Sequence, residues 1–154
     1  MAGIYETRLN EMGHTVPDAP APAANYVPYV IVGDMVYVSG QIAKDSDGLI
    51  VGKLGDDMDI AGGQSAAQVC ALNLIAQLKA ACGGDLDRLK RVVKLGGFVN
   101  ATPDFVDHPA VINGASDFVG EVFGEAGAHA RAAVGCSSLP FGVAVEVEGI
   151  FQIS

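Results

Sequence analysis

Three charged residues near the C-terminal end of the chain have the types and spacing to do chemistry. Arg131 lies in an apolar stretch, residues 129–135, and is the only Lys or Arg after Lys94. A cation is costly to bury unless an anion meets it. Arg131 therefore predicts a carboxylate partner. That partner is either Glu146 or Glu148 of the same chain, or a small anionic ligand.

The other residues with reactive side chains predict neither a metal site nor a cofactor site. The cysteines have no C-x-x-C spacing and the histidines form no H-E-x-x-H pattern. We expect free thiols in a reducing compartment. His129 lies near Arg131 and is either an ordinary surface or partly buried histidine or a catalytic one. The residues concerned are Cys70, Cys82, Cys136, His14, His108 and His129.

Charge and hydropathy exclude two classes of partner. The chain has 9 basic and 18 acidic residues, a net charge of −9, and its one basic cluster spans residues 88–94. We interpret that cluster as a solvated helix-to-strand junction and expect no nucleic acid as partner. No apolar run is long enough to cross a membrane, and no secretory signal is evident, so we expect a cytoplasmic protein. Half the residues are hydrophobic, which favours a homo-oligomer with buried subunit contacts.

Hydrophobic periodicity predicts the elements that position these residues. Residues 1–14 have a short helical pattern, and a proline-rich extended arm follows to residue 24. Strands are expected at 26–32, 35–39 and 49–51, with tight turns at 33–34 and 45–48. The clearest helix carries an apolar stripe from Ala67 to Cys82 and ends at Gly83-Gly84.

The second half alternates strand and helix. A strand is expected at 91–99, where Gly96-Gly97 indicates a bulge or a close backbone approach. A helix with Val111, Ala115, Phe118, Val119 and Val122 on one face follows, and then strands at 130–136 and 143–153.

The order β-β-β-α-β-α-β-β predicts an α+β fold, with a mixed sheet and two helices packed on one face. Residues 25–154 are expected to form a single domain, preceded by the helix and arm of residues 1–24. Four apolar residues alternate along the last strand: Val143, Val145, Val147 and Phe151. We expect neighbouring subunits to cover this alternating set on the second face of the sheet.

Two segments resemble the YjgF/RidA family. Residues 26–42, YVPYVIVGDMVYVSGQI, are similar to its first hairpin, which ends in Ser-Gly-Gln. Residues 130–148, ARAAVGCSSLPFGVAVEVE, are similar to its C-terminal signature, in which an arginine, a Leu-Pro turn and a Val-Glu pair follow one another. Arg131, Pro140 and Glu146 match that spacing without a gap, and the resemblance covers residues 25–154.

The resemblance implies a chorismate-mutase-like homotrimer whose sheets form a central barrel, with ligand clefts between subunits. It implies hydrolysis of reactive enamines and imines, such as 2-aminoacrylate, to 2-keto acids and ammonia. Arg131 would bind the substrate carboxylate and Glu146 would position or activate water. The cleft would also be lined by matching residues, which are Tyr26, Ser39, Gly40 and, through a looser match, Asn113.

One departure concerns the position two residues after the arginine. The family often has cysteine there, whereas this chain has Ala133, whose backbone carbonyl could still contact water. Two alternatives to the deaminase stay open: a trimer that binds small 2-keto acids without turnover, and the endoribonuclease activity with which some family members are labelled. The net charge argues against the second.

Overall fold

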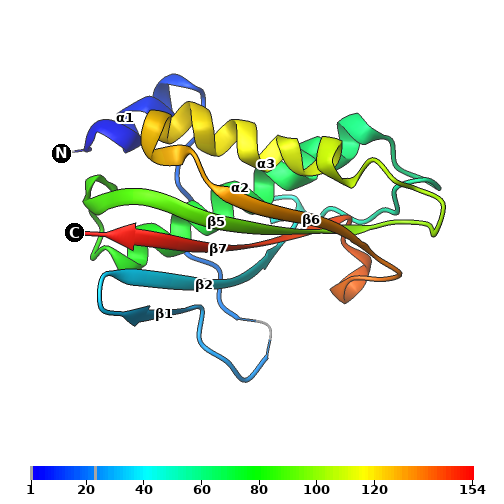
Figure 1. Cartoon of the computed structure of the whole chain (residues 1–154), viewed down its shortest axis with the longest axis horizontal. Coiled ribbons are helices and arrows are strands. Elements are labelled where there is room, and N and C mark those ends of the chain that lie inside the picture. The colour runs from blue at the N-terminus through cyan, green and yellow to red at the C-terminus, as the bar shows by residue number, and fades with distance from the viewer. Residues whose placement is uncertain (1, 23) are drawn as a thin grey trace.

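A computed structural model describes residues 2–22 and 24–154. Its main sheet is mixed and has five strands in the order β1-β2-β7-β5-β6, with β5 and β6 parallel and the other pairs antiparallel (Figure 1). The strands are β1 (Tyr29–Val32), β2 (Met35–Ile42), β5 (Leu89–Asn100), β6 (Ala130–Cys136) and β7 (Val145–Ile153). The predicted α+β class is therefore confirmed.

Helices α2 (Ile60–Ala81) and α3 (His108–Phe123) pack on one face of this sheet, as expected. Asp59 caps α2, because its carboxylate accepts from the amide of Gly62 at 2.8 Å. The apolar stripes expected on both helices are buried. The glycines at the end of α2 have positive φ, +67° and +97°, which fits the expected left-handed helix end.

The alternating set on the last strand faces these helices, which corrects one expectation. Val145, Val147 and Phe151 are buried within the single chain, and the Sγ atom of Cys70 on α2 lies 3.4 Å from the carbonyl oxygen of Val145. The set therefore needs no neighbouring subunit to cover it. The opposite face of the sheet, called the open face below, carries the intervening side chains of Glu146 and Glu148.

Two short segments also differ from the expected strands. Main-sheet pairing of β1 begins at Tyr29 rather than at residue 26, directly after Pro28, which has no N–H to donate. Residues 49–51 do not join the main sheet as a strand. Instead β3 (Lys44–Asp45) and β4 (Gly48–Leu49) form a small separate hairpin.

Gly96 and Gly97 mark a close approach and not a bulge. A Cβ added at Gly97 would lie 2.6 Å from carbon atoms of Ile112 on α3, and one at Gly96 would lie 3.0 Å from Cγ of Glu148. The register shifts of β5 lie earlier, between residues 89 and 94. Because Gly97 has no side chain, Ile112 of α3 lies directly against β5.

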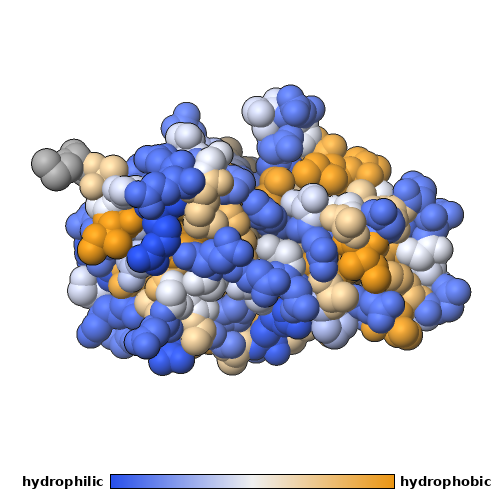
Figure 2. All heavy atoms as spheres, turned by 90° about the horizontal axis from the view of Figure 1, so that it is seen from above, coloured by the Kyte–Doolittle hydropathy of each residue, from blue (hydrophilic) through white to orange (hydrophobic). Residues whose placement is uncertain are grey.

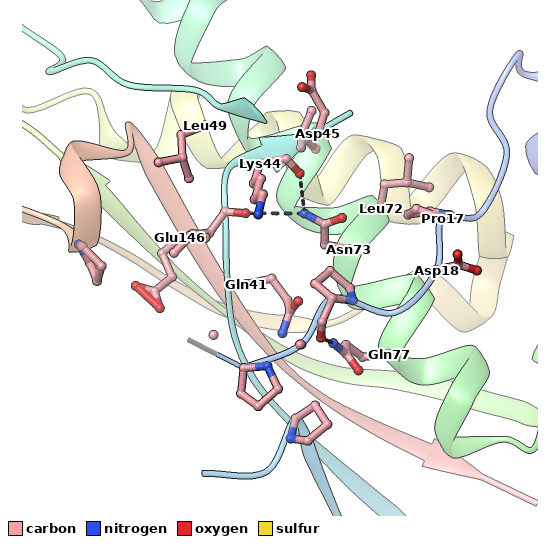
Figure 3. Close-up of a pocket in the computed structure, with 18 of the residues that line it drawn as sticks. Pro17, Asp18, Gln41, Lys44, Asp45, Leu49, Leu72, Asn73, Gln77 and Glu146 are labelled. Atoms are coloured by element: carbon pink, nitrogen blue, oxygen red, sulfur yellow. Dashed lines mark hydrogen bonds between the residues drawn. The ribbon is translucent and has the colours of Figure 1, made fainter. Parts of the chain in front are cut away.

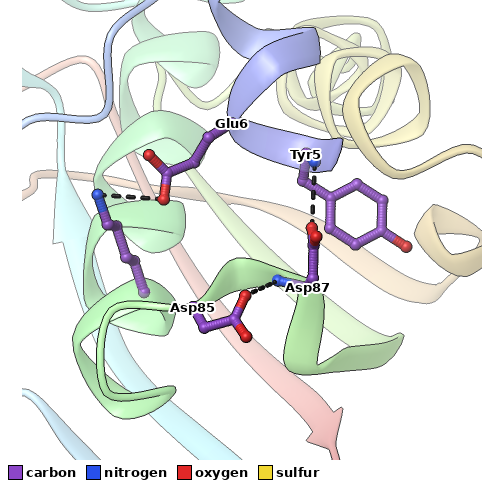
Figure 4. A network of polar contacts seen from close by, with 5 residues as sticks. Tyr5, Glu6, Asp85 and Asp87 are labelled. Atoms are coloured by element: carbon purple, nitrogen blue, oxygen red, sulfur yellow. Dashed lines mark hydrogen bonds and ion pairs between the residues drawn. The ribbon is translucent and has the colours of Figure 1, made fainter. Parts of the chain in front are cut away.

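An N-terminal helix, α1 (Ile4–Glu11), is anchored by a distant carboxylate (Figure 4). Gly3 offers no side chain to cap the helix, and Asp87 accepts from the amides of Ile4 and Tyr5 at 2.9 and 3.3 Å. Lys79 of α2 also pairs with Glu6 at 3.2 Å. These contacts hold α1, and with it the start of the arm that follows, against the body of the protein.

The surface above α1 and α3 is mostly hydrophilic, with small separate apolar patches (Figure 2). The open face differs, because several large apolar side chains on it are half exposed in the single chain. These are Val30 (48%), Val32 (61%), Tyr37 (46%) and Val134 (47%). Within the described residues, no helix has the length and apolar character needed to span a membrane.

Candidate active site

The Arg131 side chain lies on the helix side of edge strand β6 and is held by α3. Its Nη1 donates to Oδ1 of Asn113 at 2.8 Å and to Oγ of Ser116 at 3.1 Å. Its Nη2 lies 3.5 Å from the carbonyl oxygen of Pro109, at the start of the same helix. Asn113 and Ser116 are three residues apart, so both side chains project from one face of α3. The structure thus brings together Arg131 and Asn113, two of the residues that the resemblance predicts to line the cleft.

His129 reaches this group through the same serine. Its Nδ1 lies 2.6 Å from the carbonyl oxygen of Gly127, which can only accept, so Nδ1 carries the proton. In the neutral ring Nε2 is then an acceptor, and the Ser116 hydroxyl, 2.9 Å away, donates to it. Ser116 therefore accepts from Arg131 while it donates to His129. Sequence reasoning missed Ser116, although its spacing from Asn113 on a predicted helix was a usable signal.

No carboxylate of the described chain pairs with Arg131. Across residues 2–22 and 24–154, the ion pair within 4 Å is that of Lys79 with Glu6. The predicted intrachain partners, Glu146 and Glu148, are thus ruled out for this conformation. All three atoms that hold the guanidinium are neutral oxygens. The positive charge of Arg131 is left without an anion.

Ala133 shares the face of β6 that carries Arg131, since it lies two residues further along the strand. It is partly buried and packs against the hydrophobic core. Its methyl group supplies no thiol at this point.

Glu146 lies elsewhere in the sheet, on the open face of β7, beside β2. A Cβ added at Gly40 would lie 2.4 Å from Oε1 of Glu146, so the glycine leaves room for the carboxylate in its present position. Burial raises the pKa of Glu146, and the negative charge of Glu148 raises it further. A glutamate of this kind is a better proton acceptor near neutral pH than an ordinary one.

Tyr26 and Ser39 lie on the Glu146 side of the molecule. Tyr26 lines the same cavity as Gly40 and Glu146 and is 47% exposed. The Ser39 hydroxyl donates to the carbonyl of Val27 at 2.8 Å, and the Ser39 amide donates to that of Pro28 at 2.9 Å. Ser39 therefore holds the segment before β1 against β2.

The seven predicted site residues thus form two groups and not one. The Arg131 group contains Asn113 and Ala133, and the Glu146 group contains Tyr26, Ser39 and Gly40. Glu146 pairs with Phe98 of β5, which pairs in turn with Val134 of β6, so the strands that carry Glu146 and Arg131 are two positions apart in the sheet, about 10 Å. They also project from opposite faces of the sheet. A single chain does not bring the guanidinium and the carboxylate together.

The Glu146 group opens into a cavity of about 900 Å³. One wall is the N-terminal arm, and the other walls are β2, the β3–β4 hairpin and α2 (Figure 3). Gln41, Asn73 and Gln77 lie on its inner side and are buried. The predicted stripe placed Asn73 and Gln77 mostly off the apolar face of α2. In the structure Asn73 donates to the carbonyl of Lys44 and Gln77 to that of Pro20, which buries them.

The cysteines are free, as expected, and Cys70 and Cys82 are buried. Burial raises the pKa of both thiols, so neither is poised as a thiolate. In the described part of the chain, no group of three or more His, Cys, Asp or Glu side chains is arranged to hold a metal ion.

Comparison with known proteins gives the family. The family model described as "YjgF/chorismate mutase-like, putative endoribonuclease" matches residues 6–148. The chain belongs to the YjgF/RidA family. Members of this family include a protein named 2-iminobutanoate/2-iminopropanoate deaminase, from Dermatophagoides farinae. It is 30% identical over 90% of this chain and 94% of its own.

Other YjgF/RidA relatives say less about activity, although two of them are more similar to this chain. Protein TCP17 of Trypanosoma cruzi is 48% identical, over 99% of this chain and 96% of its own. A crystal structure of an Agrobacterium tumefaciens protein of unknown function is 49% identical, covers 98% of this chain and 93% of its own, and has a TM-score of 0.92. The structure of E. coli TdcF with bound serine is 26% identical, covers 88% of this chain and 94% of its own, and has a TM-score of 0.61.

Proposed function

We propose that this protein hydrolyses small imines and enamines of the 2-aminoacrylate type to 2-keto acids and ammonia, in a cleft between subunits. The observation that carries the proposal is the guanidinium of Arg131, which is held by three neutral oxygens and faces no anion within the described chain. The name of the D. farinae relative, an imine deaminase, supports the same reaction.

The bonds of Arg131 leave its carboxylate-binding edge free. Five N–H donors are available on a guanidinium. Two on Nη1 and one on Nη2 are used within the described chain, so Nε–H and one Nη2–H remain. Two adjacent N–H groups of a guanidinium match the two oxygens of a carboxylate. Substrate binding then satisfies the charge that the fold leaves uncompensated.

Glu146 is the proposed base. A water molecule attacks the carbon of the protonated imine: the C–O bond forms while the C=N π pair moves to nitrogen, and a water proton passes to the Glu146 carboxylate. The carboxyl then gives this proton to the amine nitrogen, the C–N bond breaks with its electron pair leaving on ammonia, and the hydroxyl proton returns to the Glu146 carboxylate as the carbonyl forms. An enamine first tautomerises to the imine. The raised pKa of Glu146 suits both halves of this exchange, because the group must gain and lose a proton near neutral pH.

The reaction requires Arg131 and Glu146 in one site, which a single chain does not provide. We infer a homotrimer in which the Arg131 group of one subunit faces the Glu146 group of the next. The apolar residues of the open face support this assembly, because exposed patches of this kind mark subunit contacts. The seven site residues would then line a composite cleft.

Co-expression of two inactive variants tests the shared site. Arg131→Ala and Glu146→Gln are each expected to abolish imine hydrolysis, measured as keto-acid release when a dehydratase generates 2-aminoacrylate from serine. In mixed trimers, some interfaces pair an intact arginine with an intact glutamate. Random mixing should restore about a quarter of the wild-type activity.

The outcomes separate the alternatives. No activity in the mixture would contradict the shared site, and no activity in the wild-type protein would contradict the deaminase. Tight binding of pyruvate without imine turnover would favour a ligand-binding trimer. Mixing separately purified variants without subunit exchange is the control, and it should give no recovery.

RNA cleavage is the other activity named in the family description. The net charge of −9 opposes binding to a polyanion. The one basic cluster lies at the start of β5, where the guanidinium of Arg88 donates to the carbonyls of Cys82 and Ser154. We therefore expect no RNA cleavage at physiological salt.

A further inference from the structure

The cavity beside Glu146 extends well past the atoms that imine hydrolysis requires. We propose that its portion beneath the N-terminal arm is a side-chain compartment, and that the substrates are imino acids with an extended apolar side chain. This inference rests on the proposed function, since it assigns the substrate class of the same site. The compartment is defined by Pro17, Pro20, Pro22, Val69, Leu72 and Gln77.

The arm forms a wall because its prolines keep it extended. A proline ring fixes φ and offers no amide hydrogen, so residues 17–22 cannot coil into a helix. Gln77 of α2 holds the arm in place by donating to the carbonyl of Pro20 at 2.6 Å. The anchored helix α1 holds its other end (Figure 4). A wall fixed at two points can shape a compartment.

The chemistry of the compartment suits an apolar group and not a second carboxylate. Its buried polar side chains are neutral amides, and their N–H groups are directed at backbone oxygens. Gln41 donates to Ser39, and Asn73 donates to Ile42 and Lys44. Of the charged residues that line the cavity, Asp18, Lys44 and Asp45 are exposed and Glu146 is partly buried. Lys44 is the one cation among them and is exposed, so an anion in the buried part of the compartment would lose its hydration without gaining a cation.

The compartment is continuous with the reacting position. Gly40, Tyr26 and Glu146 line the same cavity as the arm and α2. Figure 3 shows Gln41 between Glu146 on one side and Gln77 on the other. A substrate whose imine carbon lies at Glu146 can therefore extend along this one cavity towards the arm.

The volume of the cavity favours substrates whose side chain is longer than a methyl group. A cavity of about 900 Å³ is at the upper end of the range for whole small-molecule sites. A single methyl group would leave most of it to water. Each further buried methylene contributes about 0.8 kcal/mol, about a fourfold gain in affinity. Selection for a longer side chain is therefore the expected use of this space.

Equilibrium binding of stable product acids tests the compartment. We would measure the dissociation constants of pyruvate and 4-methyl-2-oxopentanoate by calorimetry, and take their ratio. Wild-type protein should bind the longer acid at least ~10-fold more tightly. Leu72→Trp fills the compartment from α2, so the ratio should fall towards one. Val69→Phe, which fills it from the same helix, is the second variant in case Leu72→Trp does not fold.

Ala80→Trp is the matched control, because Ala80 is exposed on the same helix and lies outside the cavity. It should keep the wild-type ratio. A wild-type ratio near one, as expected if a segment of a neighbouring subunit fills the space, would overturn the inference. An unchanged ratio in both filled variants would do the same.

The binding ratio is independent of turnover, so the two proposals fail separately. If the ratio of dissociation constants falls in the filled variants as expected, but no imine is hydrolysed, the compartment is supported and the deaminase proposal is contradicted. If imines are hydrolysed but the longer keto acid binds no more tightly than pyruvate, only the compartment proposal is contradicted. If neither acid binds, both proposals are wrong.

Discussion

Arg131 and Glu146 show opposite electrostatic situations within one chain. The charged guanidinium of Arg131 has only neutral hydrogen-bond partners, whereas burial and the charge of Glu148 disfavour the ionised form of Glu146 and raise its pKa. Both states cost free energy in an isolated subunit. In the proposed reaction, the substrate carboxylate at Arg131 and the water proton on Glu146 would relieve both.

The raised pKa of Glu146 leads to a prediction about pH. The base must be ionised, so kcat/KM should fall on acidification at a higher pH than an ordinary glutamate would give. Glu148→Gln removes the neighbouring negative charge and should move this acid limb to lower pH. Asp34→Asn, on an exposed turn, is the control that should leave the limb in place. A limb unchanged in Glu148→Gln would contradict Glu146 as the group that titrates.

The same pKa links to stability. When the pKa of a carboxyl group is raised in the folded state, the free energy of unfolding falls as the pH rises from the ordinary pKa of the group through the raised one. Glu146→Gln should therefore raise Tm at pH 7 while lowering kcat by about 100-fold or more. Thermal unfolding at pH 4 and pH 7 checks the sign, because the gain should be absent at the lower pH.

Ser116 is a positioning residue, because it connects Arg131 to His129 and not to substrate. Ser116→Ala leaves Nη1 with one acceptor and should weaken 2-keto acid binding by about 3- to 10-fold. The expected change lies in KM more than in kcat. Ser116→Thr keeps the hydroxyl and should restore most of the affinity. An equal loss in both variants would indicate a packing effect.

Among the elements, the contact between α2 and α3 sets the position of Asn113 and Ser116. A Cβ added at Gly114 would lie 2.2 Å from the carbonyl oxygen of Gln64 on α2, whereas one at Gly120 meets nothing within 4 Å. Gly114→Ala should therefore destabilise the fold by about 1–3 kcal/mol. Gly120→Ala, in the same helix, should stabilise it by about 0.5–1 kcal/mol.

Denaturant unfolding of the two alanine variants measures both changes. Weaker substrate binding is also expected in Gly114→Ala, because the shifted helix carries the two residues that hold Arg131. Equal stability of the two variants would show that α2 and α3 can separate without cost.

For the whole molecule, the open face should decide assembly. Val134 lies half exposed on this face at the sheet edge. Val134→Lys adds a charge that would have to be desolvated in a subunit contact, so light scattering should detect smaller species. Activity should fall in parallel while circular dichroism stays unchanged, since the chain buries its own core. Lys90→Glu, on an exposed position near the start of β5, is a charged control expected to keep the wild-type mass.

The sequence predicted most of the fold because its local signals agree. Periodicity gave α2, α3 and β6, and the paired glycines gave the end of α2. It failed where a distant segment changes the environment of a residue. Asn73 and Gln77 were expected on the polar side of α2, away from the core. In the structure both are buried, because Lys44 accepts a hydrogen bond from Asn73 and Pro20 of the arm accepts one from Gln77. The last strand shows the same effect, because alternation alone does not say which face of a sheet receives the helices.

For the site, residues 26–42 and 130–148 were enough to identify the family, and the spacing of Arg131, Pro140 and Glu146 was enough to propose the reacting groups. Their arrangement depended on tertiary packing. Strand order places Arg131 at the edge beside α3 and Glu146 two strands away, on the opposite face. Neither strand order nor the path of the arm is encoded in local periodicity, because both depend on contacts between residues far apart in the chain. That is why the unpaired charge of Arg131 was visible in the sequence, whereas its neutral partners and the arm-walled cavity beside Glu146 were not.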